Sequence, residues 1–325
     1  MVKVIFKFIL AASLGLMMTS CAKEVEDSSR DIQERILDAY IEVNCPQAKK
    51  YPSGLTIIDF KQGQGAPVYR RTAVYTDVTA TDLAGNYLET TDAQKAKEIG
   101  TYSASSYYGP KYMEIGFNST QRGMEELLLM MNEGAEATFI IPPWLTYTDS
   151  LQKGNWAKQS NIIYNLKCNF LITDIVKYER DTMRNYVRKY YTRMDTIDTG
   201  IYFKKLYESN GDTLSDQTIN VRYVGRLLDG FVFDTNIEDT AKKYGLYSED
   251  NDYEPLSVTC EEDYYTMAQN SSLVEGFCMA LLEMNVGDKA VTVFNSDWGY
   301  SYSGKDPIGK YQPLVFWLHI ESADK

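Results

Sequence analysis

Five aromatic residues of the C-terminal half have the types and positions that could build a reactive pocket. They occur in three separated segments of the chain, 219–235, 272–300 and 313–320. The five are Tyr223, Phe233, Phe277, Tyr300 and Phe316. None is a nucleophile in the usual catalytic sense, so the chemistry open to them is that of an apolar site, which excludes water and favours a less polar transition state. Aromatic residues at strand spacing more often pack in a core, so the pattern alone does not separate core from pocket.

The composition argues against several other classes of function. The 325 residues include a single histidine, His319, which leaves little basis for a zinc cluster or a Ser-His-Asp arrangement, and no metal or cofactor is expected. A net charge of −12, without a cluster of Lys and Arg, argues against nucleic acid and anionic membrane surface as partners. The length exceeds one ordinary domain and predicts two.

The N-terminus is typical of an exported protein. Residues 1–20 combine a basic start with a mostly apolar stretch, 8–18, whose eleven residues are too few to span a bilayer as a helix, and we interpret them as a signal peptide. The Met-Thr-Ser-Cys that follows resembles the lipobox of bacterial lipoproteins, although Met18 stands where Leu is usual. The resemblance implies that Cys21 anchors the protein to a membrane of the cell envelope through a lipid, on the periplasmic or the outer-surface face. An ordinary signal peptide followed by a chance cysteine is the alternative.

Four cysteines remain after Cys21, and an oxidising compartment would allow them to form disulfides. They are Cys45, Cys168, Cys260 and Cys278. Four cysteines admit three pairings, and the sequence does not choose among them. Cys168 lies in an apolar strand pattern and Cys278 in an apolar helical run, so we expect both to be small buried hydrophobic residues.

The chain contains an internal repeat. When Gly85 is aligned with Gly230 the offset is 145 residues (230 − 85), and seven further identities keep it. They are Thr90/Thr235, Ala96/Ala241, Lys97/Lys242, Gly100/Gly245, Tyr102/Tyr247, Tyr108/Tyr253 and Pro110/Pro255. After a length change the offset becomes 153 (276 − 123), as for Gly134 and Gly287. A register kept through so many identities indicates two copies of one domain. The predicted segments are an acidic tether and helix at 21–50, a first domain at 51–178, and a linker helix with a second domain at 179–325.

Each copy shows the same order of predicted elements. A charged helical pattern, at 30–40 or 180–191, precedes a strand with alternating polar and apolar residues, at 53–60 or 199–206. The leading helices could equally be solvated spacers. In the second copy the expected strands are 200–207, 219–228, 231–235, 288–295 and 313–321. Val274–Met284 is the one compact amphipathic helix, and laying its apolar face across the strands completes a two-layer α+β domain.

The second copy resembles an FKBP-type peptidyl-prolyl cis-trans isomerase. The landmarks occur in the family's order: VRYVGRLLDGFVFD, then VEGFCMALLEMNVGDKA, then DWGY and PLVF. The match covers about 199–322. The resemblance implies two FKBP-like domains of the α+β class, each an antiparallel sheet wrapped around one short helix, and each preceded by a helix.

The resemblance also assigns site residues, position by position. The catalytic positions fall on Tyr223, Phe233, Asp234 and Tyr300, and the substrate-binding positions on Val274, Phe277, Ile308 and Phe316. Three features depart from the family. Ser301 stands where Gly usually follows the pocket tyrosine, Pro313 alone remains of a Pro-Pro pair, and the connection Thr235–Ser271 is longer than usual. That insertion lies beside the predicted cleft and could either cover it or extend it.

The first copy departs further from the family at the same positions. The substituted pairs are Val78/Tyr223, Leu88/Phe233, Glu89/Asp234, Met124/Phe277 and Cys168/Phe316, whereas Tyr147 keeps the aromatic ring of Tyr300. Its core pattern persists in RGMEELLLMMNEG (122–134). We therefore expect a domain that folds but does not catalyse proline isomerisation.

These observations lead to one functional prediction and one alternative. The prediction is an extracytoplasmic isomerase that acts on X-Pro bonds in proline-containing segments of envelope or secreted proteins. Rotation about this bond crosses a barrier of ~18–20 kcal/mol because it destroys amide resonance, and the twisted amide is less polar, so an apolar pocket favours it. The alternative is a non-catalytic binding module or a holdase chaperone on the cell envelope, which the 26 tyrosines and the degenerate first copy favour.

Overall fold

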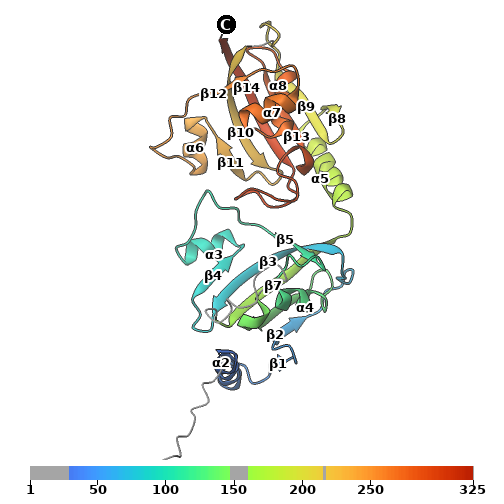
Figure 1. The fold of residues 1–325 in the computed structure, drawn as a ribbon, viewed down its shortest axis with the longest axis vertical. Coiled ribbons are helices and arrows are strands. Elements are labelled where there is room, and N and C mark those ends of the chain that lie inside the picture. The colour runs from blue at the N-terminus through green and yellow to red at the C-terminus, as the bar shows by residue number, and fades with distance from the viewer. Residues whose placement is uncertain (1–28, 147–159, 215–216, 325) are drawn as a thin grey trace, which may run out of the picture.

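Two antiparallel sheets of seven strands each dominate the fold (Figure 1). The computed structural model describes residues 29–146, 160–214 and 217–324. The strands of the first sheet are β1 Lys49–Lys50, β2 Thr56–Lys61, β3 Thr72–Asp82, β4 Tyr87–Thr90, β5 Lys111–Ile115, β6 Glu136–Ile141 and β7 Ile162–Ile172. Those of the second are β8 Asp195–Asp198, β9 Ile201–Tyr207, β10 Thr218–Leu227, β11 Val232–Thr235, β12 Leu256–Thr259, β13 Lys289–Phe294 and β14 Leu314–Asp324.

Short helices accompany both sheets. In the first half they are α2 Ser29–Asn44, α3 Ala93–Glu98, α4 Arg122–Leu128 and the 3-10 turn η1 Pro143–Leu145. In the second half they are α5 Ile175–Tyr190, α6 Glu238–Tyr244, α7 Tyr264–Ser271, α8 Glu275–Leu282 and the 3-10 turn η3 Ser296–Trp298. Sequence signals explain several helix ends: Asp263 caps α7 through the N–H of Thr266, and Gly245 ends α6 in the left-handed region at φ 72°.

The two sheets share one topology. The first has the order β1-β2-β6-β7-β3-β4, and the second, read from its other edge, has the order β8-β9-β13-β14-β10-β11. Both have a bulge at the same place: between Tyr75 and Thr76 in β3, and between Asn220 and Val221 in β10. These positions differ by the 145 residues of the sequence repeat, so the repeat and the α+β class with two similar sheets are confirmed.

In each half a short apolar helix completes the core. In the second half α8 lies across the sheet and buries Phe277, Cys278 and Leu281 against the strands. In the first half α4 buries Met124, Leu127 and Leu128 in the same way. The expected helix at Val274–Met284 is therefore confirmed, with slightly narrower bounds. All four cysteines of the described residues are buried and free, as expected of Cys168 and Cys278.

The leading helix α5 packs against both sheets and is not a solvated spacer. At its start, Tyr178 packs its ring on Tyr75 and Phe170 of the first sheet, at centroid distances of 5.8 and 5.7 Å. One turn later Met183 packs on the outer face of the second sheet, where it forms a buried cluster with Val291 and Val293. Helix α5 therefore joins the two halves as a packed element (Figure 1).

The long connection of the second half, Thr235–Ser271, contains two parts. The first, with α6, repeats a unit of the first half: Tyr247 stacks on Tyr253 at 5.5 Å, and Tyr102 stacks on Tyr108 at 5.3 Å. The second part, β12 and α7, was not among the elements expected from the sequence. Helix α7 packs beside α8 and places Tyr264 edge-on against Trp298 at 5.4 Å.

Candidate functional site

Four of the predicted pocket rings form one cluster around Phe316. Phe316 from β14 meets Phe277 from α8 at a centroid distance of 5.1 Å and Phe233 from β11 at 5.7 Å. Tyr223 from β10 meets Phe277 at 5.8 Å. The interplanar angles of 81–89° are those of edge-to-face pairs, the arrangement that aromatic quadrupoles favour. Three distant segments thus converge on one apolar site.

Gly225 makes this convergence sterically possible. A Cβ at this position would lie 2.6 Å from Phe233 and 2.8 Å from Phe316. The residue lies in the interior of β10 opposite Phe316. A glycine inside a strand marks a close approach of other groups, and this is the signal by which the sequence could have revealed the role of Gly225. Neither Gly225 nor Phe294, which stacks on Phe316 at 5.8 Å, is among the site residues predicted from the sequence.

The cluster has a buried floor and an accessible rim. Phe277 and Phe316 expose 2% and 5% of their surface, and Ile308 is similarly buried. Tyr223, Phe233, Val274 and Tyr300 are half-buried and pack against the same core. Asp234 is exposed. This combination suits a site that receives an apolar group from solvent.

A polar pair marks the rim. The Tyr223 hydroxyl donates a hydrogen bond of 2.9 Å to Oδ2 of Asp234. Burial, and then the negative charge of Asp234, raise the pKa of Tyr223 above its ordinary value, so the phenol stays protonated and keeps its proton available for hydrogen bonding. The pair therefore holds a carboxylate in a fixed orientation beside the rings.

Tyr300 and Ile308 come from the segment between β13 and β14. Tyr300 follows η3, and the ammonium group of Lys305 lies 5.3 Å from the centre of its ring. Its neighbour Ser301 has φ 50°, in the left-handed region where glycine is favoured. The conformation of this turn accounts for the glycine that the FKBP pattern usually has here.

Comparison with known proteins relates the segment that contains this site to a family. A model of the FKBP-type peptidyl-prolyl cis-trans isomerases matches residues 211–321, the segment that contains the ring cluster. The second half contains an FKBP-type domain. A curated relative, the short-type peptidyl-prolyl cis-trans isomerase of Methanocaldococcus jannaschii, is 33% identical over 73 residues. These residues are 22% of this chain and 41% of the relative, so the match spans less than half of the relative's length.

Two solved structures are also similar to parts of the chain. A peptidyl-prolyl cis-trans isomerase from Pseudomonas syringae is 26% identical, with 46% of this chain and 94% of that chain covered and a TM-score of 0.35. FkpA from Escherichia coli is 21% identical, with 46% of this chain and 61% of that chain covered and a TM-score of 0.34.

The insertion in the FKBP-type domain leaves the rim accessible. With α6, β12 and α7 in place, Tyr223, Phe233 and Tyr300 remain partly exposed. The insertion instead lies along β10, to which β12 is paired, and against Trp298.

The first half has a different site at the place equivalent to the pocket of the FKBP-type domain. Val78, Glu89 and Met124 line a cavity of about 240 Å³ there. The alignment of Cys168 with Phe316 is wrong. Phe316 lies opposite Gly225 in the second sheet, and the counterpart of Gly225 in the repeat is Ala80, which lies opposite Tyr164 in the first sheet. Cys168 lies opposite Thr76 instead. Tyr147 lies outside the described residues.

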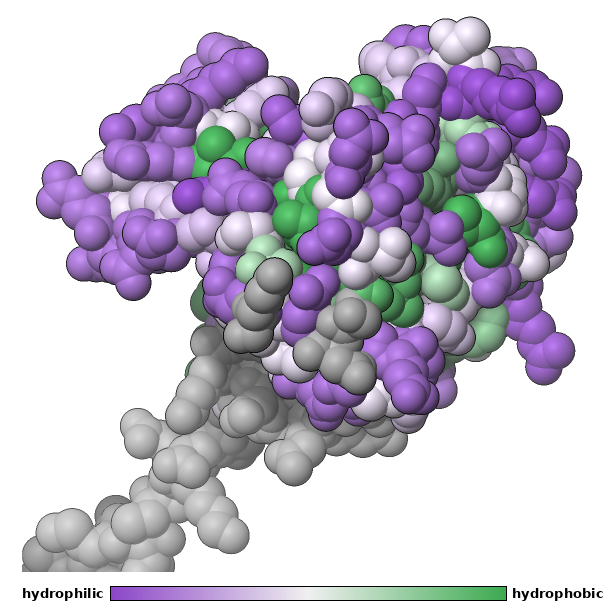
Figure 2. All heavy atoms as spheres, turned by 90° about the horizontal axis from the view of Figure 1, so that it is seen from above, coloured by the Kyte–Doolittle hydropathy of each residue, from purple (hydrophilic) through white to green (hydrophobic). Residues whose placement is uncertain are grey.

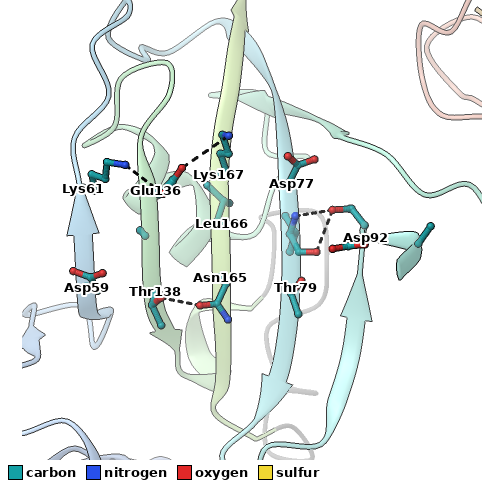
Figure 3. Close-up of a pocket in the computed structure, with 14 residues that line it drawn as sticks. Asp59, Lys61, Asp77, Thr79, Asp92, Glu136, Thr138, Asn165, Leu166 and Lys167 are labelled. Carbon is teal, nitrogen blue, oxygen red and sulfur yellow. Dashed lines mark hydrogen bonds and ion pairs between the residues drawn. The ribbon is translucent and has the colours of Figure 1, made fainter. Parts of the chain in front are cut away.

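A larger hollow lies on the outer face of the first sheet. It measures about 630 Å³, and Figure 3 shows Asp59, Asp77 and Asn165 lining it. The carboxylate of Glu136 lies between two ammonium groups, 3.8 Å from Nζ of Lys61 and 3.9 Å from Nζ of Lys167. The walls are charged and lack aromatic rings, so this hollow does not resemble the pocket of the FKBP-type domain. No group of three or more His, Cys, Asp or Glu side chains in the described residues is arranged to hold a metal ion.

Proposed function

We propose that the FKBP-type domain of this chain catalyses cis-trans isomerisation of X-Pro bonds in peptide segments of client proteins. The observation that carries the proposal is the cluster of Tyr223, Phe233, Phe277 and Phe316 beside Asp234, which combines an apolar floor with one oriented carboxylate. The family match of residues 211–321 supports the same activity.

The rings lower the barrier by favouring the twisted amide. Phe277 and Phe316 form the floor on which the pyrrolidine ring lies, and water is excluded from the bond that rotates. The planar amide is stabilised by resonance and by water, and the twisted amide loses both, so an apolar site stabilises the transition state relative to the ground state. Each tenfold gain in rate requires about 1.4 kcal/mol of such differential stabilisation.

Polar groups at the rim orient the substrate. The Tyr300 hydroxyl donates to a substrate carbonyl, and Asp234, held by Tyr223, faces the carbonyl that rotates. Val274 precedes α8, and its carbonyl accepts the N–H groups of Phe277 and Cys278. In this proposal the Val274 N–H donates to the substrate backbone. Ile308 forms an apolar wall beside the ring cluster.

The location proposed for this activity is the cell envelope, with Cys21 as the lipid-anchored residue. The basis is the N-terminal sequence pattern, whose residues lie outside the described part of the chain. None of the helices in the described residues combines the length and the apolar character that crossing a bilayer would require. Metabolic labelling with a fatty-acid analogue tests the anchor: labelling of the full-length protein that disappears in Cys21→Ala supports it, and equal labelling of both proteins contradicts it.

The activity is tested with a protease-free proline-peptide assay on the full chain. Phe233→Ala and Asp234→Ala are expected to lower kcat/KM by roughly tenfold or more, since each removes a contact made to the rotating amide. The first half provides matched controls: Leu88→Ala and Glu89→Ala change the equivalent positions and leave turnover unchanged. A wild-type protein without turnover refutes the proposal.

A non-catalytic holdase is the second candidate, favoured by the first half, which keeps the fold without the aromatic pocket. A holdase binds exposed apolar segments through apolar surface of its own. On the face that Figure 2 shows, apolar residues form small separate patches among polar ones. Suppression of client aggregation that survives Phe233→Ala supports this candidate, and loss of suppression together with turnover opposes it.

A further inference from the structure

The segment from Ser296 to Gln312 carries two pocket residues, Tyr300 and Ile308, and is fixed by its own backbone hydrogen bonds. The Ser301 N–H donates to the Ser296 carbonyl at 2.8 Å, and the Tyr311 N–H donates to the Ser301 carbonyl at 2.9 Å. Lys305 and Ile308 form two backbone hydrogen bonds, in which the N–H of each residue donates to the carbonyl of the other. We call this stretch, 296–312, the pocket segment. Because its two ends are linked through Ser301, a displacement of either end moves Tyr300.

A buried glutamate of α5 holds the first end of the pocket segment. Glu179 accepts the Ser296 N–H at 2.8 Å and the Ser296 hydroxyl at 3.1 Å. Glu179 is 3% exposed and Ser296 is 1% exposed. Hydrogen bonds to a charged acceptor in a buried site are among the stronger ones in proteins, and their loss leaves a buried group without a partner.

The first half of the chain holds the other end. The Lys310 ammonium lies 3.1 Å from Oε2 of Glu114, which is at the end of β5 and mostly buried. Gln312 donates to the Tyr75 hydroxyl at 2.9 Å. Between these two contacts, the ring of Tyr311 packs on Tyr112 at 5.2 Å. Three consecutive residues of the pocket segment therefore rest on the first sheet, which lacks the aromatic pocket.

We propose that Glu179 and Glu114, which lie outside the ring cluster, are positioning residues that fix the pocket segment and thereby place Tyr300 and Ile308 for catalysis. The first half then has a function of its own in the reaction, as the surface on which the pocket wall of the second half is set. This inference rests on the proposed isomerase activity.

The experiment exchanges the charges of one contact in the full chain. Glu114→Lys and Lys310→Glu each place like charges together, and the double variant E114K/K310E restores an opposite pair. Each single variant is expected to raise KM and to lower kcat/KM on the order of tenfold, because a small displacement of a positioning contact has effects of this size. Hydrogen exchange of residues 296–312 is expected to accelerate in the single variants, and both quantities recover in the double variant.

A second variant tests the other end. Glu179→Ala is expected to accelerate exchange in the pocket segment and to raise KM, whereas Glu179→Gln keeps a carbonyl acceptor for the Ser296 N–H and retains most of the wild-type KM. A residue needed only for folding lowers the active fraction, and so lowers apparent kcat while KM stays constant. If Glu179→Ala does not fold, the charge exchange at Glu114 and Lys310 decides alone.

The control is an ion pair away from the pocket. In the first half, Nζ of Lys50 lies 2.5 Å from Oδ1 of Asp38. The substitution Asp38→Lys is expected to leave KM and the hydrogen exchange of residues 296–312 unchanged. Unchanged exchange and KM in Glu114→Lys, or failure of the double variant to recover, overturns the inference. A wild-type protein without turnover refutes the proposed activity instead, and the exchange measurement still decides whether Glu114 and Glu179 fix the segment.

Discussion

The two halves of this chain build the same fold around different pockets. Both sheets have the same strand order, both bulge at equivalent positions, and both lay a short apolar helix across the strands. At the pocket positions the residue pairs are Tyr223/Val78, Gly225/Ala80, Phe233/Leu88, Asp234/Glu89, Phe277/Met124 and Phe316/Tyr164. The core therefore tolerates the loss of three of the four rings of the cluster, which suggests that these rings are kept in the second half for what they bind.

The rims of the two sites differ in charge chemistry as well. In the second half Asp234 is held by a neutral tyrosine, whereas in the first half Glu89 forms an ion pair with Lys111. Tyr164, at the position of Phe316, is buried and donates its hydroxyl to Gln121 at 3.3 Å. An internally satisfied polar site has little to offer an apolar proline ring.

The largest expected effect comes from giving the second half the pocket of the first. The triple variant Y223V/F233L/F277M is expected to lose turnover by on the order of 100-fold or more, because it removes three rings and leaves Asp234 without its donor. The replacement side chains already occur in a folded copy of the domain, so the far-UV circular dichroism should remain that of the wild type. A folded triple variant with nearly full turnover shows that the difference between the pockets is not what matters for catalysis.

The two leading helices also differ in the contacts that join them to their domains. Helix α2 uses a neutral contact, in which Asn161 donates to the carbonyl and the side chain of Gln33, at 3.3 and 3.1 Å. Helix α5 uses the buried carboxyl group of Glu179. The pKa of this group is raised from 4.5 to about 7. Burial is the largest cause, the hydrogen bonds from Ser296 lower the pKa, and the nearby charge of Asp297 raises it. Of these two contacts in the described residues, the one made by α5 therefore titrates near neutral pH.

The sign of the pH effect follows from the raised pKa. The folded protein binds the Glu179 proton more tightly than the unfolded chain does, so this contribution to stability is complete below pH 4.5 and is lost as the pH rises through about 7. A rise of this size corresponds to about 3 kcal/mol as an upper value. Chemical denaturation from pH 4 to 8 is expected to show this loss as the difference between the wild type and Glu179→Gln. A difference in unfolding free energy between the two proteins that stays constant with pH contradicts this expectation.

Gly225 and Ala80 provide a third comparison. In the first half Leu88 is 54% exposed, so its side chain leaves room for the Ala80 methyl group, whereas in the second half Phe233 occupies that space. Gly225→Ala is expected to displace Phe233 or Phe316, to destabilise the protein by about 2 kcal/mol and to lower kcat/KM by roughly tenfold. The reverse change, Ala80→Gly, is expected to cost about 1 kcal/mol without affecting turnover. Similar kinetics for both variants would show that the close approach of the rings is not essential.

Features of the fold that depend on local sequence pattern and on the internal repeat could be predicted from the sequence. The α+β class and the helix that carries Phe277 follow from periodicity and composition, and the structure has both. The alignment of Cys168 with Phe316 failed because pairing register is set by contacts between distant strands, and a shift of register moves a side chain to a different partner. A glycine inside a strand marks Gly225 as a point of close approach, but the strand pattern does not identify the rings that crowd it, which come from β11 and β14.

The smallest expected effect concerns a departure from the family in the pocket segment. Ser301 has φ 50°, which costs a residue with a Cβ atom roughly 1 kcal/mol, and Ser301→Gly removes that cost while increasing the entropy of the unfolded chain. The two effects nearly cancel, so the net change in unfolding free energy should stay within about 1 kcal/mol. Turnover should change by less than about twofold, because the Ser301 N–H and carbonyl are already fixed by Ser296 and Tyr311. Ser301→Ala, which keeps the Cβ atom and lacks the hydroxyl, separates backbone strain from any contribution of the hydroxyl group. A large gain in turnover for Ser301→Gly alone would show that the strained turn limits catalysis, and that this half, too, has moved away from the family's pocket.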